Sequence, residues 1–187
     1  GKTTVMSQIA GELRQDAGQI IFAGQEISAM STVRRVRLGL ARSFQVTQLL
    51  EDYTALDNVA LPLIIAGVGT KEIGKRVRAA LDQVGLLGRE QSVPLELSTG
   101  EQQRVGIARA VVSKPPILIA DEPTGNLDPE LSIEVMNIFR RFNEVGVTVL
   151  VASHDIYLLE HFPVRRVRLE AGRIVESSSA GTTKLLD

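Results

Sequence analysis

The sequence predicts an α/β fold with a mostly parallel sheet, and three consecutive segments carry this prediction. Residues 117–120 are all apolar, which is typical of a strand buried on both faces of a sheet. A second apolar run at 147–152 has the same character, and the intervening segment 131–145 is expected to form a helix. A strand, a helix and a strand in this order predict a parallel pair joined by a right-handed crossover.

Size and composition narrow the possible classes of protein. The 187 residues can bury one good core, which favours a single domain with a small helical insertion. The 21 lysines and arginines nearly balance the 22 aspartates and glutamates, so no global field attracts nucleic acid or an anionic membrane. Without cysteine there is no disulfide framework. The longest apolar run, 59–68, is shorter than the roughly 20 residues of a spanning helix and contains a proline, so we expect no membrane crossing.

The segments at both ends of the chain are expected to alternate between helix and strand. A helix begins at Gly1, because apolar residues recur at helical spacing up to Leu13, and it is expected to end near Gly18. The other expected elements are a strand at 20–22 turned by Ala23-Gly24, a basic helix at 31–38, a strand at 40–44, a hairpin of 164–169 and 173–176 across Ala171-Gly172, and a flexible tail at 177–183.

Most of the segment between residues 52 and 113 is expected to be helical. Asp57 can cap a helix over 58–66, and residues 71–84 carry apolar side chains on one face. Ser98 can cap a helix that runs to residue 113. We therefore predict a helical subdomain with approximate bounds 52–113, inserted in a single domain that spans 1–187.

The first four residues suit the binding of a triphosphate. Backbone amides and the dipole at the start of a helix attract an anion, to which Gly1 and Thr4 can contribute close backbone contacts. The ammonium group of Lys2 can reach β- and γ-phosphate oxygens, and the hydroxyl group of Thr3 can bind Mg²⁺. A match of four residues also occurs often by chance. In addition, the upstream glycines that would complete a phosphate-binding loop are not in the chain. Residue 1 is not methionine, so we expect the first strands to be missing.

Acidic and polar residues follow the predicted strands at one edge of the sheet. Asp121 follows a buried strand and can hold the Mg²⁺ that bridges phosphates, while Glu122 can accept a proton from the attacking water. His154 follows the next strand and reaches the same edge, where a γ-phosphate contact competes with an ordinary capping or surface role. Gln45 can offer its amide oxygen to Mg²⁺ or to the attacking water, although by itself it is an ordinary loop residue.

Taken in order, these residues resemble the motifs of ABC transporter ATPases over nearly the whole chain. The matching segments are 1–4 for Walker A, Gln45 for the Q-loop, 97–101 for the signature motif, 117–121 for Walker B, Glu122 for the catalytic glutamate, 125–128 for the D-loop, and His154 for the switch histidine. The resemblance implies a P-loop NTPase core of the RecA-like kind with a small helical ABC subdomain. It also implies ATP and Mg²⁺ as cofactors and ATP hydrolysis as the activity.

The resemblance further implies a second ATPase subunit and a transmembrane permease subunit as partners. In that family two ATPase subunits close head to tail, so Ser98, Gly100 and Asp128 are expected at the nucleotide sites, with Ser98 and Gly100 reaching the γ-phosphate held mainly by the other subunit. The implied location is peripheral, at the cytoplasmic face of the inner membrane, and no nucleic acid is expected. Thr99 stands where members usually carry glycine, so we expect weaker or altered dimer closure. With an incomplete P-loop, the chain alone is expected to bind ATP poorly and to hydrolyse it inefficiently.

Two parts of the chain resemble different groups within the family, so the substrate stays open. Residues 101–110, 123–128 and 143–149 are similar to the group of cell-division, lipoprotein-releasing and macrolide-export ATPases, whereas 34–45 are more similar to ATPases of branched-chain amino-acid importers. We favour the first group because its match spans more positions. The alternatives are a nucleotide-gated cell-division regulator with little transport, and a soluble ABC protein that acts on ribosomes or DNA through Arg34, Arg35 and Arg37.

Overall fold

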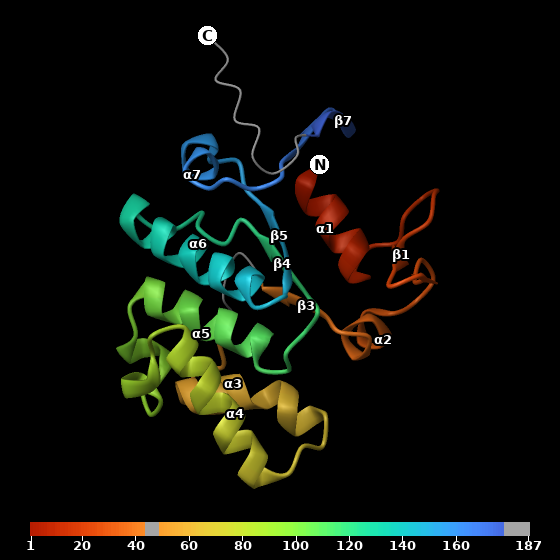
Figure 1. Ribbon diagram of the computed structural model, residues 1–187. Helices are drawn as coiled ribbons and strands as arrows, with labels where there is room; N and C mark the ends of the chain where they lie inside the picture. The colour runs from red at the N-terminus through yellow and green to blue at the C-terminus, as the bar shows by residue number, and fades with distance from the viewer. Residues whose placement is uncertain (44–48, 178–187) are drawn as a thin grey trace.

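A three-stranded parallel sheet lies at the centre of the computed structural model, which describes residues 1–43 and 49–177 (Figure 1). The strands are β3 (Leu40–Ser43), β4 (Ile117–Asp121) and β5 (Thr148–Ala152), in the order β3-β4-β5. Leu118 of the central strand stands opposite Ala41 on one side and Val149 on the other. The predicted α/β fold with a mostly parallel sheet is confirmed, and β4 is buried as expected.

The prediction for β5 was partly wrong. Its residues alternate between exposed and half-buried up to Ala152, and Leu150 is 36% exposed, so the strand is not buried on both faces. Within the described residues β5 is the last strand of the parallel sheet, with a neighbour on one side only. Successive side chains of a strand point to opposite faces of the sheet, so this alternation means that one face of β5 is open to solvent. An unbroken apolar run therefore marked a strand correctly but overstated its burial.

The first helix is shorter than predicted. Helix α1 (Lys2–Ala10) ends at Gly11, whose φ of 84° is the left-handed conformation that commonly terminates helices, rather than near Gly18. The buried side chain of Arg35 lies against Gly11 and donates hydrogen bonds to the carbonyl oxygens of Gln8 and Ile9, in the last turn of α1. Arg35 belongs to α2 (Thr32–Arg37), so a contact distant in sequence caps the helix.

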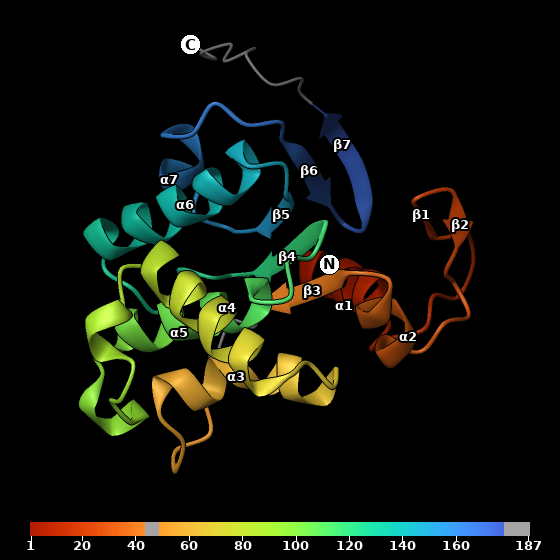
Figure 2. The same cartoon turned by 60° about the horizontal axis from the view of Figure 1, so that its bottom comes forward.

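A short hairpin connects α1 to α2. Strands β1 (Ile21–Phe22) and β2 (Gln25–Glu26) pair antiparallel, and the turn passes through Ala23 and Gly24 as predicted. In Figure 2 this hairpin and α2 lie to one side of the sheet, beyond α1. The hairpin therefore stands apart from the carboxyl end of β4.

Three helices form a layer on the opposite side from α7 and the C-terminal hairpin (Figures 1 and 2). They are α3 (Ala55–Ile65), α4 (Thr70–Gln83) and α5 (Thr99–Val111), with the short 3₁₀ turns η1 (Leu87–Arg89) and η2 (Pro94–Glu96) between α4 and α5. Each helix contributes a fully buried valine to one shared core, namely Val59, Val77 and Val105. The subdomain bounds 52–113 stay a prediction.

The start of α3 corrects a predicted cap. Thr54, rather than Asp57, is the N-cap residue, and its side chain accepts a hydrogen bond from the backbone N–H of Asp57 at 3.1 Å. The carboxylate of Asp57 in turn accepts from the backbone N–H of Thr54 at 3.2 Å. The two residues form a reciprocal capping box. In such a box both side chains bond to backbone N–H groups, so the sequence alone does not show which of the two is the N-cap residue.

The remaining elements follow β4 in the chain. Helix α6 (Pro129–Glu144) starts two residues before its predicted bound, because Asp128 caps it and Pro129 suits its first turn. Helix α7 (Ile156–Glu160) follows β5, and β6 (Val167–Glu170) pairs antiparallel with β7 (Arg173–Ser177), which confirms the predicted hairpin. The predicted tail 177–183 lies outside the described residues beyond Ser177. Over the described ranges, every helix is too short or too polar to span a membrane.

Candidate functional site

The carboxyl ends of β4 and β5 and the start of α1 meet at one place, as the sequence predicted. Asp121 is the last residue of β4 and Glu122 follows it, whereas His154 lies two residues after the end of β5. Lys2 and Thr3 open α1. Lys2 contacts Ser153, which follows β5, and Thr3 contacts Asp121 at the end of β4. Three segments that are distant in sequence thus supply one cluster of charged and polar side chains.

Thr3 and Asp121 bring two oxygen atoms of the kind that bind Mg²⁺ close together. The hydroxyl group of Thr3 donates to Oδ1 of Asp121 across 3.5 Å, and the Asp121 side chain is only 4% exposed. Mg²⁺ is usually held by one or two protein oxygens together with phosphate oxygens and waters. A hydroxyl and a carboxylate at this separation fit such an ion.

Lys2 joins the carboxyl end of β5 to the residue after β4. Its ammonium group donates to the backbone carbonyl of Ser153 at 2.6 Å and lies 3.6 Å from Oε1 of Glu122. The Lys2 side chain is 38% exposed, so it keeps access to solvent while making both contacts. A cation that is held near a helix start and open to solvent is suited to an incoming phosphate.

Glu122 has a strained backbone at the centre of the cluster. Its φ is 47°, which is uncommon for a residue other than glycine, and its N–H donates to the carbonyl of Ala152 at 2.8 Å. Its side chain is 12% exposed and lies between Lys2 and His154, with Nδ1 of His154 2.8 Å from Oε2. Strain of this kind gathers at functional sites, where the surrounding structure holds the residue in place.

Arg42 is a site residue that the sequence reasoning missed. It lies on β3, and its guanidinium group donates to Oδ2 of Asp121 at 3.2 Å. The same group also contacts Ser7 and Glu12. A signal was available, since an arginine within a strand of the central sheet must find a partner when it is mostly buried. Which partner it finds depends on the tertiary arrangement.

Ser98 and Gly100 occupy a second location, at the start of α5. The hydroxyl group of Ser98 accepts from the N–H of Glu101 at 3.3 Å, and the carboxylate of Glu101 accepts from the N–H of Ser98 at 2.8 Å. This backbone hydrogen bond lowers the pKa of Glu101. Gly100 is buried, and a Cβ atom built there would lie 3.1 Å from Leu131. Among the described contacts, those of Ser98 and Gly100 stay within α5 and α6.

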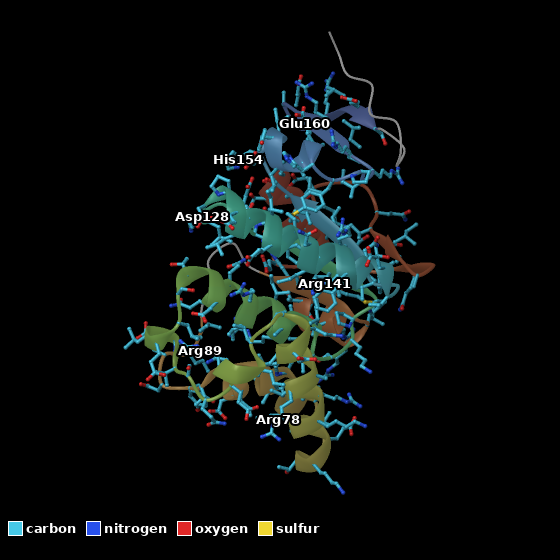
Figure 3. The ribbon with its side chains drawn as sticks, turned by 60° about the vertical axis from the view of Figure 1, so that its left-hand side comes forward. Arg78, Arg89, Asp128, Arg141, His154 and Glu160 are labelled. Atoms are coloured by element: carbon cyan, nitrogen blue, oxygen red, sulfur yellow. The ribbon has the colours of Figure 1, made fainter. Side chains whose placement is uncertain are left out.

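Asp128 caps the helix that carries Leu131. Its carboxylate accepts from the N–H of Leu131 at 2.9 Å. Figure 3 shows Asp128 and His154 on the same side of the molecule, with Arg89 further along that side. Because Arg89 pairs with Glu101 at 3.4 Å, the start of α5 belongs to the same side. The two predicted sites therefore face one flank of the protein.

The other predicted residues are only partly placed. Gly1 and Thr4 are exposed at the start of α1, and Thr99 is exposed in the first turn of α5. Gln45 lies outside the described residues. The three arginines considered as a basic patch do not form one, because Arg35 is 2% exposed and its guanidinium group is used within the fold.

Comparisons with known proteins show which family the sequence resembles. The profile of the family described as "ABC transporter" matches residues 1–125. "Cell division ATP-binding protein FtsE" of Escherichia coli (strain K12) is 50% identical over 176 residues, which cover 93% of this chain and 79% of that protein. The protein of the same name from Streptococcus pneumoniae serotype 2 (strain D39) is 39% identical over 183 residues, with 97% and 80% covered.

A solved structure matches the fold as well. The structure of cbiO1 from Clostridium perfringens, described as part of the ABC transporter complex cbiONQ, has a TM-score of 0.87 to this chain at 28% identity. The match covers 96% of this chain and 73% of that chain. The likeness therefore extends over the central sheet, the helical layer and the C-terminal hairpin together.

Proposed function

The chain belongs to the ABC transporter family of ATP-binding proteins, and from this membership we propose how its residues bind and hydrolyse ATP. The family profile spans two thirds of the chain, and the relatives named for cell division agree with the group that the sequence favoured. The chain is an ABC ATP-binding subunit of a transporter-like complex, and members of this family hydrolyse ATP.

Lys2 and Thr3 bind the phosphate end of the nucleotide. The start of α1 attracts the anion, and the Lys2 ammonium exchanges its contact with the Ser153 carbonyl for β- and γ-phosphate oxygens. Thr3 and Asp121 would hold Mg²⁺ with their oxygen atoms, and Gly1 and Thr4 would give backbone contacts to the phosphates. A Mg²⁺ ion held by these residues would offset the negative charge that develops on the phosphate during hydrolysis.

Glu122 is the base that accepts a proton from the attacking water, and His154 holds it in place. The observation that carries this assignment is the chain of contacts from Lys2 through Glu122 to His154, at 3.6 Å and 2.8 Å. It places the carboxylate between the cation assigned to phosphate and an exposed imidazole that can also reach the γ-phosphate. Gln45 is assigned to Mg²⁺ and to the attacking water.

A second ATPase subunit completes each nucleotide site. Ser98 and Gly100 open a helix whose exposed first turn can present amides to an anion held by another subunit. Asp128 lies on the same flank as His154, where that subunit would pack (Figure 3). This arrangement makes hydrolysis depend on closure of two subunits.

The partner in the membrane is a permease subunit, docked between Gln45 and the helical layer, which places the chain peripherally at the cytoplasmic face of the inner membrane. A second candidate function is a nucleotide-gated regulator of cell division with little transport. The 50% identity to a protein named for cell division favours it. Hydrolysis measured with and without the membrane partner separates the two: a regulator keeps negligible turnover in both conditions.

Glu122→Gln in the full-length protein tests the assignment. We expect turnover to fall by about 100-fold or more, since the amide cannot accept the proton, while binding of ATP is retained. Glu160→Gln is the matched control, because Glu160 is an exposed carboxylate on α7, near His154 in Figure 3. Unchanged turnover in Glu122→Gln would remove the role given to this residue.

A further inference from the structure

The guanidinium group of Arg42 connects the proposed metal carboxylate to the first helix. One terminal nitrogen donates to Oδ2 of Asp121 at 3.2 Å. The other donates to the hydroxyl group of Ser7 at 3.2 Å and pairs with Glu12. Ser7 lies on α1 and Glu12 follows it, so one side chain on β3 joins β4 to the segment that begins with Lys2 and Thr3.

The two oxygen atoms of Asp121 have different partners. Oδ1 accepts from Thr3, whereas Oδ2 accepts from Arg42. Both side chains of the Arg42–Asp121 pair are mostly buried, at 12% and 4% exposed, so solvent competes little with their contact. The carboxylate is thereby rotated so that one oxygen faces Arg42 and the other faces the Thr3 hydroxyl. A planar guanidinium group suits this task because its two donors have fixed directions.

Glu12 fixes the guanidinium from the other side. It pairs with Arg42 and also accepts from the Ser7 hydroxyl at 3.2 Å. The positive charge therefore lies between two carboxylates, and neither carboxylate alone determines its position. Glu12 also offsets part of the positive charge of Arg42. Arg42 therefore does not cancel the whole negative charge of the Asp121 carboxylate.

We propose that Arg42 is a positioning residue for magnesium binding, which orients Asp121 so that Oδ1 is presented beside Thr3. This inference rests on the proposed function, in which Thr3 and Asp121 hold Mg²⁺. Residues that contact metal ligands from outside commonly contribute 10–100-fold to metal affinity. Arg42 leaves Oδ1 to the ion, so its contact with Oδ2 is compatible with metal binding.

Binding of a non-hydrolysable ATP analogue to the full-length protein tests this role. Mg²⁺ is titrated at fixed nucleotide, and the affinity for the nucleotide is also measured in EDTA. For Arg42→Met we expect about tenfold weaker Mg²⁺ binding, with the affinity in EDTA unchanged, because Lys2 and the start of α1 still bind phosphate. The Mg²⁺ affinity of Arg42→Lys should lie between those of the wild type and Arg42→Met. A lysine ammonium group lacks the two terminal nitrogen atoms with which the guanidinium group contacts Asp121 and Glu12 at the same time.

Arg78→Met is the matched control. It removes another arginine that pairs with a glutamate, Glu90, at 2.9 Å, but on α4 and away from Asp121. We expect no change in Mg²⁺ binding for this variant. Asp121→Asn should weaken Mg²⁺ binding more than Arg42→Met does, because it alters the ligand itself.

The outcomes separate this inference from the proposed function. If wild-type binding does not depend on Mg²⁺, or if Asp121→Asn leaves it unchanged, the proposed metal site fails. If Asp121→Asn weakens Mg²⁺ binding but Arg42→Met leaves it unchanged or makes it tighter, only the role of Arg42 is overturned. An equal loss of affinity with and without Mg²⁺ in both Arg42 variants also overturns it, because a general structural role would produce that result.

Discussion

The Oε2 atom of Glu122 lies 2.8 Å from Nδ1 of His154, although the two residues follow different strands. Glu122 is mostly buried and His154 is 74% exposed, so the imidazole is the outer member of the pair. The parallel register of β4 and β5, with Asp121 opposite Ala152, brings the two residues together. The pair thus depends on the sheet and not on a local turn.

Removal of His154 should lower turnover with little effect on the KM for ATP. In His154→Ala the Glu122 carboxylate loses its outer contact but keeps Lys2, so ATP binding is retained and turnover falls by about 100-fold. Steady-state kinetics of the full-length protein measures both constants. His161→Ala is the control, since this second histidine is exposed and its ring contacts Tyr157. A similar loss in both variants would argue against a specific role for His154.

Gly100 and Leu131 should be energetically coupled. A Cβ atom at residue 100 would lie 3.1 Å from a methyl group of Leu131, which is closer than ordinary van der Waals contact. Gly74→Ala on α4 meets nothing within 4 Å and should stabilise the protein by about 0.5–1 kcal/mol through helix propensity. Gly100→Ala should increase the free energy of unfolding by less than this or decrease it, because Leu131 must move.

A double-mutant cycle with urea unfolding measures this coupling. In the Leu131→Ala background, Gly100→Ala should be more favourable than in the wild type by about 0.5–1 kcal/mol. Equal effects of Gly100→Ala in the two backgrounds would show that the start of α5 tolerates a side chain. The glycine would then be needed only for contacts with another molecule.

The sequence predicted the elements of the fold more reliably than their ends. The cap at Ser98 was predicted because a capping residue has a local signature, and its hydroxyl group does accept from the N–H of Glu101. The end of α1 was not, because Gly11 and Gly18 both adopt a φ of 84° and the buried Arg35 decides between them. Contacts between distant segments carry information that local periodicity does not contain.

The same limit applies to the candidate site. Lys2 and Asp121 could be assigned because a helix start and a strand end each have a local signature. The strained backbone of Glu122 and the contact of Arg42 with Asp121 could not, since both depend on how β3, β4 and α1 pack. The sequence named most residues that meet at the sheet edge but did not indicate what orients them.

The capping box at the start of α5 predicts a dependence of stability on pH. The N–H of Ser98 lowers the pKa of Glu101 below its ordinary value of 4.5 in the folded state. The ionised carboxylate therefore stabilises the fold above about pH 4.5, and this contribution is lost as the pH falls through the lower folded pKa. At an exposed helix start it amounts to about 0.3–1 kcal/mol.

Glu101→Gln isolates this contribution. The free energy of unfolding of the wild type should exceed that of the variant at pH 6–7, and the difference should shrink once the pH falls below the ordinary value of 4.5. Urea unfolding at several pH values measures the difference. Glu160→Gln, which alters an exposed carboxylate outside a capping box, is the control variant. A difference for Glu101→Gln that does not change with pH would contradict the assigned cause.

Thr99→Gly should strengthen ATP-dependent self-association while leaving the fold almost unchanged. Thr99 is an exposed helical residue in the first turn of α5, and its φ is not in the left-handed region, so the folded chain does not require glycine there. The Thr99 side chain covers part of the surface at the start of α5, where we propose that the other subunit's nucleotide binds. Removing it should let that nucleotide approach the amides more closely.

Sedimentation of the full-length protein with ATP, in the Glu122→Gln background, measures this association. We expect Thr99→Gly to tighten it by about tenfold or less, equivalent to about 1.4 kcal/mol at most, and to change the free energy of unfolding by about 0.5 kcal/mol or less. Thr70→Gly is the matched control, because Thr70 is the exposed first residue of α4. If both variants associate like the wild type, the start of α5 does not lie against the nucleotide of a second subunit. The head-to-tail arrangement would then need a different contact surface.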